Sequence, residues 1–146
     1  MAYKKKKFPK NFRVKGNEIS LAVRDILEVY SHNVTVLTKE ATDKTAEEAL
    51  GRVKQLAPKS SGTYADAWAS KVGFENAFEK RTILYVEAPH YRLTHLLEYG
   101  HVIRNQYGGP LGKGRTAEFH HVEPTVEFAE KMYSDLIREA IKDAAE

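Results

Sequence analysis

The side chains of this chain that could do chemistry are concentrated in one segment, Pro89–His101, which reads P-H-Y-R-L-T-H-L-L-E-Y-G-H. It holds three of the chain's six histidines, together with an arginine and a glutamate. These residue types act as general acids and bases, and His and Glu also bind metal ions. Three leucines lie at the i, i+3 and i+4 positions of one helical face, which predicts a short helix with a polar rim. The face consists of Leu93, Leu96 and Leu97, and the rim of His90, Arg92, His95, Glu98 and His101.

The ends of this short helix are marked by a proline and a glycine. Pro89 is predicted to open the helix, because its missing N–H would have no partner in the first turn. Gly100 is predicted to close the helix in the left-handed conformation. We expect the leucine face to dock the helix on the core, and the rim to fix the turn that follows.

The spacing of the histidines does not favour a metal site on this helix. His90 and His95 are five positions apart and His95 and His101 are six apart, whereas ligands on one helical face are typically four apart. Glu98 and His101 are three apart, but a helix that ends at Gly100 would separate them. We therefore predict no metal and no cofactor, and expect His95 and His101 to be buried, hydrogen-bonded histidines that fix a turn.

Other catalytic arrangements are also unsupported by the sequence. The adjacent His120 and His121 would point to opposite faces of a strand. The chain has no cysteine, so it has no thiolate nucleophile, disulfide scaffold or thiolate zinc site. It has no G-x-S-x-G elbow either. Asp66 and Glu98 are carboxylates that nothing in the sequence places together.

Composition favours one domain of a protein that does not span a membrane. The chain has 146 residues, 42% of them hydrophobic, and a net charge of +3. Its apolar runs are shorter than the roughly 20 residues of a membrane span, and no apolar segment of a signal peptide follows the basic N-terminus. We predict a single domain over residues 17–146, preceded by a basic arm over residues 1–16.

The basic arm carries seven lysines and arginines and no acidic residue, so the remainder of the chain is net acidic. Like charges repel and no apolar period is present, which predicts a flexible arm that is either disordered or ordered by a partner. Its function is either contact with nucleic acid phosphates or with an acidic protein surface, or only that of a solvated tail. The candidate contacts to a partner or DNA are Lys4, Lys5, Lys6 and Lys7.

Apolar periodicity predicts a long helix over Asn17–Ala57, with a break or kink possible at Asn33–Val36, and an amphipathic helix from Pro124 to Ala145. Between them, strands are predicted over Tyr64–Phe74, Thr82–Glu87, Val102–Arg104 and Thr116–Val122. Trp68 is expected to anchor the core or a sheet face. The fold class is therefore α+β, with a small antiparallel sheet, the short capped helix inserted in it, and helices at both ends.

The segment Asn105–Arg115, N-Q-Y-G-G-P-L-G-K-G-R, is rich in glycine and basic residues. A phosphate-binding loop needs two glycines five positions apart, followed by Lys and Ser or Thr. Here Gly108 and Gly112 are four apart, and Gly114 stands in the place of Ser or Thr. We reject ATP binding and predict a mobile loop that becomes ordered against a partner.

The run Tyr91–His101 closely resembles the signature of the "gene product ten-like" tail-component proteins of tailed phages, which are small neck proteins of siphophages. The resemblance extends from about Asn17 to the C-terminus. The matching residues are Pro58, Ser61, Gly62, Tyr64 and Trp68 in the first part, Tyr91, Arg92, Leu93, His95, Leu96, Leu97, Glu98, Tyr99, Gly100 and His101 in the second, and His121, Val122 and Pro124 in the last. His120 stands where the family usually has proline.

The resemblance implies a structural virion protein of the neck, and not an enzyme, that acts in tail completion or head–tail joining. Such proteins are expected to form homo-oligomeric rings, often hexameric, that contact other neck, connector and tail-tube proteins. The protein would be made in the host cytoplasm and incorporated into the virion. Lys113 and Arg115 could face genomic DNA or a neighbouring protein. A non-specific nucleic-acid-binding protein that uses the basic arm is the alternative.

Overall fold

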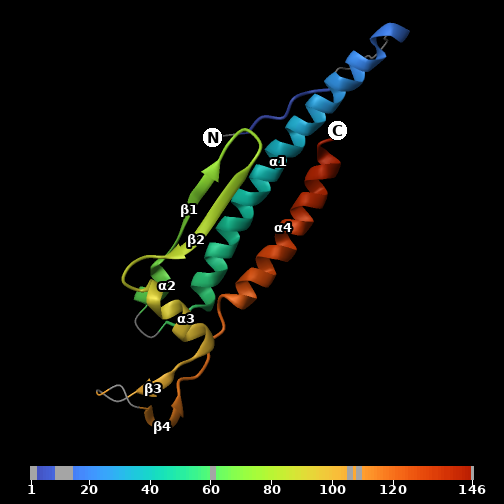
Figure 1. Cartoon of the computed structure of the whole chain (residues 1–146). Coiled ribbons are helices and arrows are strands. Elements are labelled where there is room, and N and C mark those ends of the chain that lie inside the picture. Colours follow the sequence, from blue (N-terminus) through green and yellow to red (C-terminus); the bar gives the residue numbers. More distant parts are fainter. Residues whose placement is uncertain (1–2, 9–14, 60–61, 105–106, 108–109, 146) are drawn as a thin grey trace. The chain divides into compact units, whose positions relative to one another are not determined.

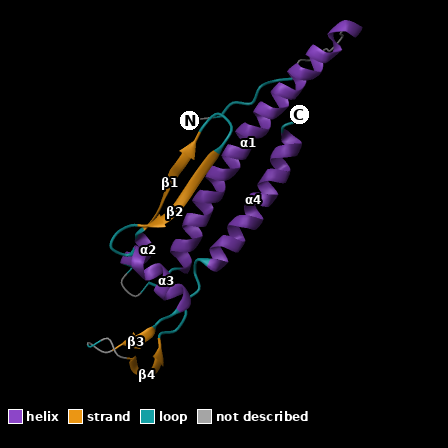
Figure 2. Ribbon diagram, viewed as in Figure 1, coloured by secondary structure: helices purple, strands orange, loops and turns teal. Residues whose placement is uncertain are grey.

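The computed structural model describes residues 3–8, 15–59, 62–104, 107 and 110–145, the side chains of residues 110–113 excepted. The fold is mixed helix and sheet, as predicted, with long helices near both ends of the chain (Figure 1, Figure 2). The elements are a 3-10 turn (Gly16–Glu18), α1 (Ile19–Leu56), α2 (Thr63–Asp66), β1 (Trp68–Glu75), β2 (Lys80–Val86), α3 (Tyr91–Tyr99), β3 (Val102–Arg104), β4 (Pro110–Arg115) and α4 (Glu123–Asp143). The chain divides into two compact units, the first with residues 1–45, 72–82 and 131–146, the second with residues 46–71 and 83–130.

The first helix, α1, runs without interruption over 38 residues, which is about 57 Å at 1.5 Å per residue. The weak helix formers at Asn33–Val36 do not interrupt it, because their polar groups are satisfied. The hydroxyl of Thr35 donates to the Ser31 carbonyl 2.9 Å away, and the buried amide of Asn33 bonds outside the helix. No helix in the described part of the chain is both long and apolar enough to cross a membrane.

In the first unit, two lysines with buried side chains form hydrogen bonds and ion pairs that hold the tip of the β1–β2 hairpin on α1. Lys80 Nζ lies 2.6 Å from a carboxylate oxygen of Asp43 and 3.0 Å from the Tyr3 hydroxyl, and Lys39 Nζ lies 3.3 Å from Glu75. Burial by itself lowers the pKa of Lys80, but the hydrogen bonds to Asp43 and Tyr3 raise it well above its ordinary value. Lys80 therefore stays charged, and the hairpin is held by charge-assisted hydrogen bonds.

The basic arm also contacts α1 in the first unit, although it forms no helix or strand over residues 3–8. The Lys6 N–H donates to Asn33 Oδ1 at 2.7 Å, and Asn33 Nδ2 donates to the Lys6 carbonyl at 3.0 Å. A buried amide needs such partners, and Asn33 is 1% exposed. A flexible arm is the expectation from sequence, but these residues of the arm are fixed on the helix by an asparagine that charge patterning does not reveal.

The core of the second unit combines side chains from the end of α1 with those of α2, β1 and β2. The buried members are Val53, Ala57, Tyr64, Ala65, Trp68 and Val86, with Leu50, Ala67, Leu84, Leu97 and Val122 packed against them. Trp68 is 7% exposed, which confirms the prediction that it anchors the core. The strand predicted over Tyr64–Phe74 is wrong in its first part, where Thr63–Asp66 forms α2. Alanine is the strongest helix former, so its alternation with larger residues there does not require a strand.

Two separate two-stranded sheets form in place of one. β1 and β2 make a hairpin, which confirms the strand predicted at Thr82–Glu87. β3 pairs antiparallel with β4, with Val102 opposite Arg115 and Arg104 opposite Pro110. The second half of the segment predicted as a glycine-rich loop is therefore a strand, while residues 105, 106, 108 and 109 lie outside the described residues. The strand predicted over Thr116–Val122 does not form, since this stretch has no regular structure up to the start of α4.

Candidate functional site

Glu98 in the last turn of α3 is buried, and its carboxylate accepts three backbone hydrogen bonds. The donors are the N–H groups of His121, Val122 and Glu123, each 3.0 Å away. These residues stand at the start of α4, where backbone N–H groups have no partner within the helix and the helix dipole favours a negative charge. Glu98 thus caps α4 from a different helix, across more than 20 positions of sequence.

Two opposing influences act on the protonation of Glu98. Burial by itself raises the pKa of its carboxyl, but the hydrogen bonds from the backbone of Glu123, His121 and Val122 outweigh burial and hold the pKa below its ordinary value. The group is therefore an anion at neutral pH, and its negative charge is stabilised by N–H donors and by the dipole of α4.

His121 continues this buried network. Its Nδ1 lies 2.8 Å from the Phe119 carbonyl and 3.0 Å from Glu98 Oε2, and its Nε2 lies 2.8 Å from the Tyr64 hydroxyl. A carbonyl oxygen can only accept, so Nδ1 carries the proton, and in the neutral ring Nε2 accepts from Tyr64. The Tyr64 hydroxyl also lies 3.1 Å from Thr94 Oγ1, and burial raises the pKa of this hydroxyl.

Three rings pack edge-to-face around this network. The centroid of His121 lies 5.5 Å from that of Tyr64 and 6.2 Å from that of Trp68, and the Tyr64 and Trp68 centroids are 6.3 Å apart. Such T-shaped pairs stabilise a core beyond the area they bury. Residues from all three segments of the resemblance, with Glu98 from the middle one, therefore meet in the core of the second unit. We call Tyr64, Trp68, Glu98 and His121 the buried clasp.

The face of α3 that packs inward differs from the predicted leucine face. The inward side chains are Thr94, Leu97 and Glu98, again at i, i+3 and i+4, whereas Leu93 is 40% exposed and Leu96 is 37% exposed. The inward face is shifted by one residue position, and in this orientation Glu98 and Thr94 reach their hydrogen-bond partners at the start of α4 and on Tyr64. The docking role predicted for Leu93 and Leu96 is wrong, and only Leu97 packs on the core.

The prediction that two histidines of this segment are buried is also wrong. His95 and His101 are both exposed: the ring of His95 packs on Tyr99 with 5.2 Å between centroids, and His101 Nδ1 lies 3.1 Å from the Thr116 hydroxyl. The buried histidine is His121, at 0% exposure. A sequence pattern does not reveal this difference, because burial of His121 depends on partners from α2 and α3.

Gly100 ends α3 with φ 62° and ψ 164°. The positive φ agrees with the choice of glycine, but the ψ lies outside the predicted left-handed helical region, in one that only glycine commonly adopts. A Cβ at this position would lie 2.7 Å from the Thr116 carbonyl oxygen. The turn then pairs His101 with Thr116, whose N–H donates to the His101 carbonyl at 2.9 Å.

Replacing Gly100 with alanine is expected to lower the free energy of unfolding by about 1–3 kcal/mol, from backbone strain and the clash with Thr116. Urea denaturation followed by circular dichroism measures this change. Gly51→Ala is the matched control, because nothing lies within 4 Å of a Cβ built there and alanine favours the interior of α1. Equal stability of the two variants would contradict the strain.

The remaining predicted site residues lie on the surface or at helix ends. Arg92 Nε donates to the Tyr91 hydroxyl at 3.1 Å, and Pro124 occupies the first turn of α4. Of the candidate contacts, Lys5 Nζ donates to the Asp143 carbonyl, Lys6 pairs with Glu28 at 3.3 Å, and Lys4 and Lys7 are exposed. The guanidinium of Arg115 donates to the Tyr99 carbonyl at 3.3 Å, and the Lys113 side chain lies outside the described residues.

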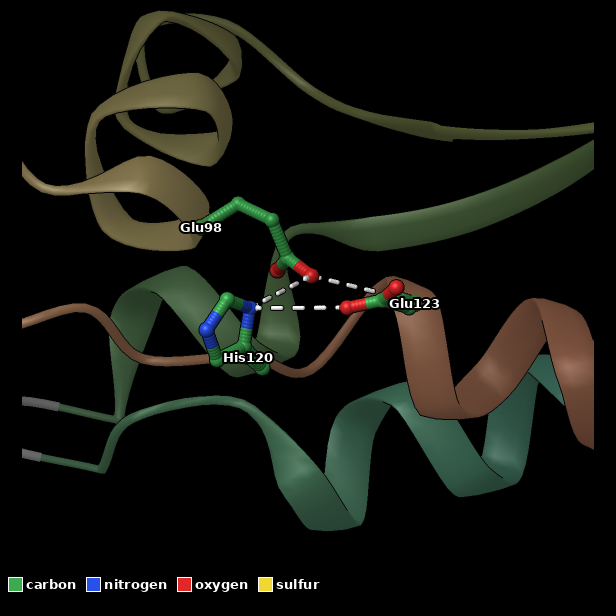
Figure 3. A group of neighbouring side chains, drawn as sticks. All are labelled: Glu98, His120 and Glu123. Carbon is green, nitrogen blue, oxygen red and sulfur yellow. Dashed lines mark hydrogen bonds and ion pairs between the residues drawn. The ribbon is translucent and has the colours of Figure 1, made fainter.

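Among the residues that the structure describes, one group of side chains could hold a metal ion. His120 Nδ1 lies 3.7 Å from Glu98 Oε1 and 3.7 Å from Glu123 Oε2 (Figure 3). The potential ligand atoms of the three residues all lie within 4.8 Å of one another. Reasoning from the sequence did not combine His120 with a carboxylate. The i, i+3 spacing of His120 and Glu123 was the available signal, but the contribution of Glu98 depends on tertiary structure.

Comparison with known proteins identifies no relative: no family model, curated protein or solved structure matches this chain.

Proposed function

We propose that this protein is a structural component of the neck of a tailed phage, acting in tail completion or head–tail joining as part of a homo-oligomeric ring. One observation carries the proposal: the buried clasp joins residues from each of the three segments that resemble the tail-component family. The side chains of Tyr64, Glu98 and His121 bond one another and the start of α4, and a buried polar network of that kind helps to specify a fold.

The apolar surface of α1 supports assembly with other copies. Five apolar side chains in its first turns are 37–60% exposed, namely Ile19, Leu21, Val23, Ile26 and Leu27. Apolar side chains gathered on an exposed surface commonly mark a protein–protein interface. Packing against neighbouring subunits would remove these side chains from water at a gain of about 25 cal/mol per Å² of apolar area.

Deletion of the gene from a phage that carries it tests the role in the virion. We expect filled heads and tails that fail to join, or tails of abnormal length, as seen by electron microscopy of the lysate. A plasmid copy of the wild-type gene should restore infectious particles. Normal virions from the deletion strain would exclude the proposed function.

The mass of the purified full-length protein tests the ring directly. A defined oligomer is expected by native mass spectrometry, and Leu27→Lys is expected to shift it to smaller species, because Leu27 is 60% exposed and contributes little to the monomer core. Circular dichroism confirms that the variant is folded. Titration with duplex DNA tests the alternative, a non-specific nucleic-acid-binding protein. If the basic arm binds DNA, the logarithm of the binding constant should fall with the logarithm of the salt concentration, at a slope of about −0.9 per phosphate neutralised.

A further inference from the structure

The side chains of Glu98, His120 and Glu123 converge on one point beside the start of α4 (Figure 3). His120 Nδ1 lies 3.7 Å from each of the two carboxylate oxygens that face it. This separation is longer than the 2.7–2.9 Å or so of a charge-assisted hydrogen bond. It is close to the spacing of two ligands on a tetrahedral zinc ion, about 3.3 Å for bonds of about 2.05 Å.

The carboxylate of Glu98 keeps one lone pair available to bind a metal ion. Its Oε2 accepts the N–H groups of His121 and Val122, which occupy both lone pairs of that oxygen. From the described residues, its Oε1 accepts one hydrogen bond, that of the Glu123 N–H at 3.0 Å. The remaining lone pair belongs to the oxygen that faces His120, and the hydrogen bonds to the backbone fix this oxygen in place.

The tautomer of His120 is set by a second carboxylate. His120 Nε2 lies 3.2 Å from Glu118 Oε2, and a carboxylate can only accept, so Nε2 carries the proton and Nδ1 of the neutral ring presents a lone pair. Metal-bound histidines typically donate their other ring N–H to a carboxylate in this way, which fixes the ring and raises its basicity as a ligand.

Three lone pairs that face one another across a short gap repel unless a positive charge lies between them. We propose that Glu98 Oε1, His120 Nδ1 and Glu123 Oε2 bind a divalent metal ion, with Glu118 orienting His120. One imidazole and two carboxylates suit ions such as Zn²⁺, whereas Ca²⁺ and Mg²⁺ prefer oxygen ligands alone. A pocket of about 380 Å³ lies beside Glu98 and Glu123, away from His120, and leaves room for water ligands on that side. This site does not depend on the proposed role in the virion.

Titration of the tag-free, chelator-treated full-length protein with ZnCl₂ in a calorimeter tests the site. We expect one Zn²⁺ per chain and much weaker binding of Mg²⁺ and Ca²⁺. Glu123→Gln and His120→Asn should each weaken Zn²⁺ binding at least tenfold, and Glu118→Gln by roughly tenfold, as for other residues that orient a ligand. Their side chains are exposed in wild type, at 71%, 45% and 54%, so the variants keep their fold.

Glu127→Gln is the matched control, because Glu127 lines the same pocket one turn further along α4 but is not part of the ligand group. It should bind Zn²⁺ like the wild type. Absence of Zn²⁺ binding would overturn the site, as would equal binding by Glu123→Gln, His120→Asn and the control. In either case the three side chains form only an ion-pair cluster around a protonated histidine.

Discussion

A Glu98→Ala variant is expected to lose about 3–5 kcal/mol of the free energy of unfolding, because it leaves buried donors without a partner. The carboxylate accepts three backbone N–H groups at the start of α4 and lies 3.0 Å from His121 Nδ1. Water cannot replace it easily at a residue that is 4% exposed. Urea denaturation measures the loss, and faster hydrogen exchange at Val122 and Glu123 locates it at the helix start.

Acid provides a second measurement of the same interaction. The pKa of Glu98 is held below its ordinary value of 4.5 in the folded state. The stability it contributes is therefore complete above about pH 4.5 and is lost as the pH falls through the folded-state pKa. The wild type should lose stability in this acidic range more steeply than Glu98→Ala does.

Glu127→Ala is the control for the glutamate variant, since Glu127 is exposed on α4 and its replacement should change stability by less than about 0.5 kcal/mol. A Glu98→Ala protein as stable as this control, with an unchanged acid transition, would show that the start of α4 is satisfied by water.

The second large effect is expected at His121, where an adjacent histidine offers a matched comparison. His121→Ala should cost about 3–4 kcal/mol, because it removes a fully buried ring that contacts Tyr64 and Trp68 and leaves a cavity. His120→Ala, at a half-exposed position one residue earlier, should change stability by less than about 0.5 kcal/mol when measured with a chelator present.

Thermal or urea unfolding of the two histidine variants under identical conditions measures the difference in their stability. Near-ultraviolet circular dichroism adds a local signal, because Trp68 packs edge-to-face on His121 at 6.2 Å and should lose its fixed environment only in His121→Ala. Similar losses in both variants would mean that His121 is not the residue that completes the core.

Local sequence patterns were sufficient to predict the elements that form without specific tertiary partners. The apolar periodicity of α1 and α4 and the β-branched and aromatic run of β2 predicted those elements, because helix and strand preferences act over neighbouring residues. Local patterns failed at Tyr64–Asp66, where an alanine-rich sequence fits a strand or a helical turn equally well. They also failed at Thr116–Val122, because the backbone of this stretch forms hydrogen bonds with Glu98 and Leu97 and not with another strand.

The sequence by itself therefore determined the fold class and the long helices at both ends. Tertiary structure alone decided which face of α3 turns inward, which of two adjacent histidines is buried, and that Glu98 meets the start of α4. These outcomes depend on partners more than 20 positions apart along the chain. A buried charge or imidazole is tolerated only where such partners satisfy it, and local sequence does not contain that information.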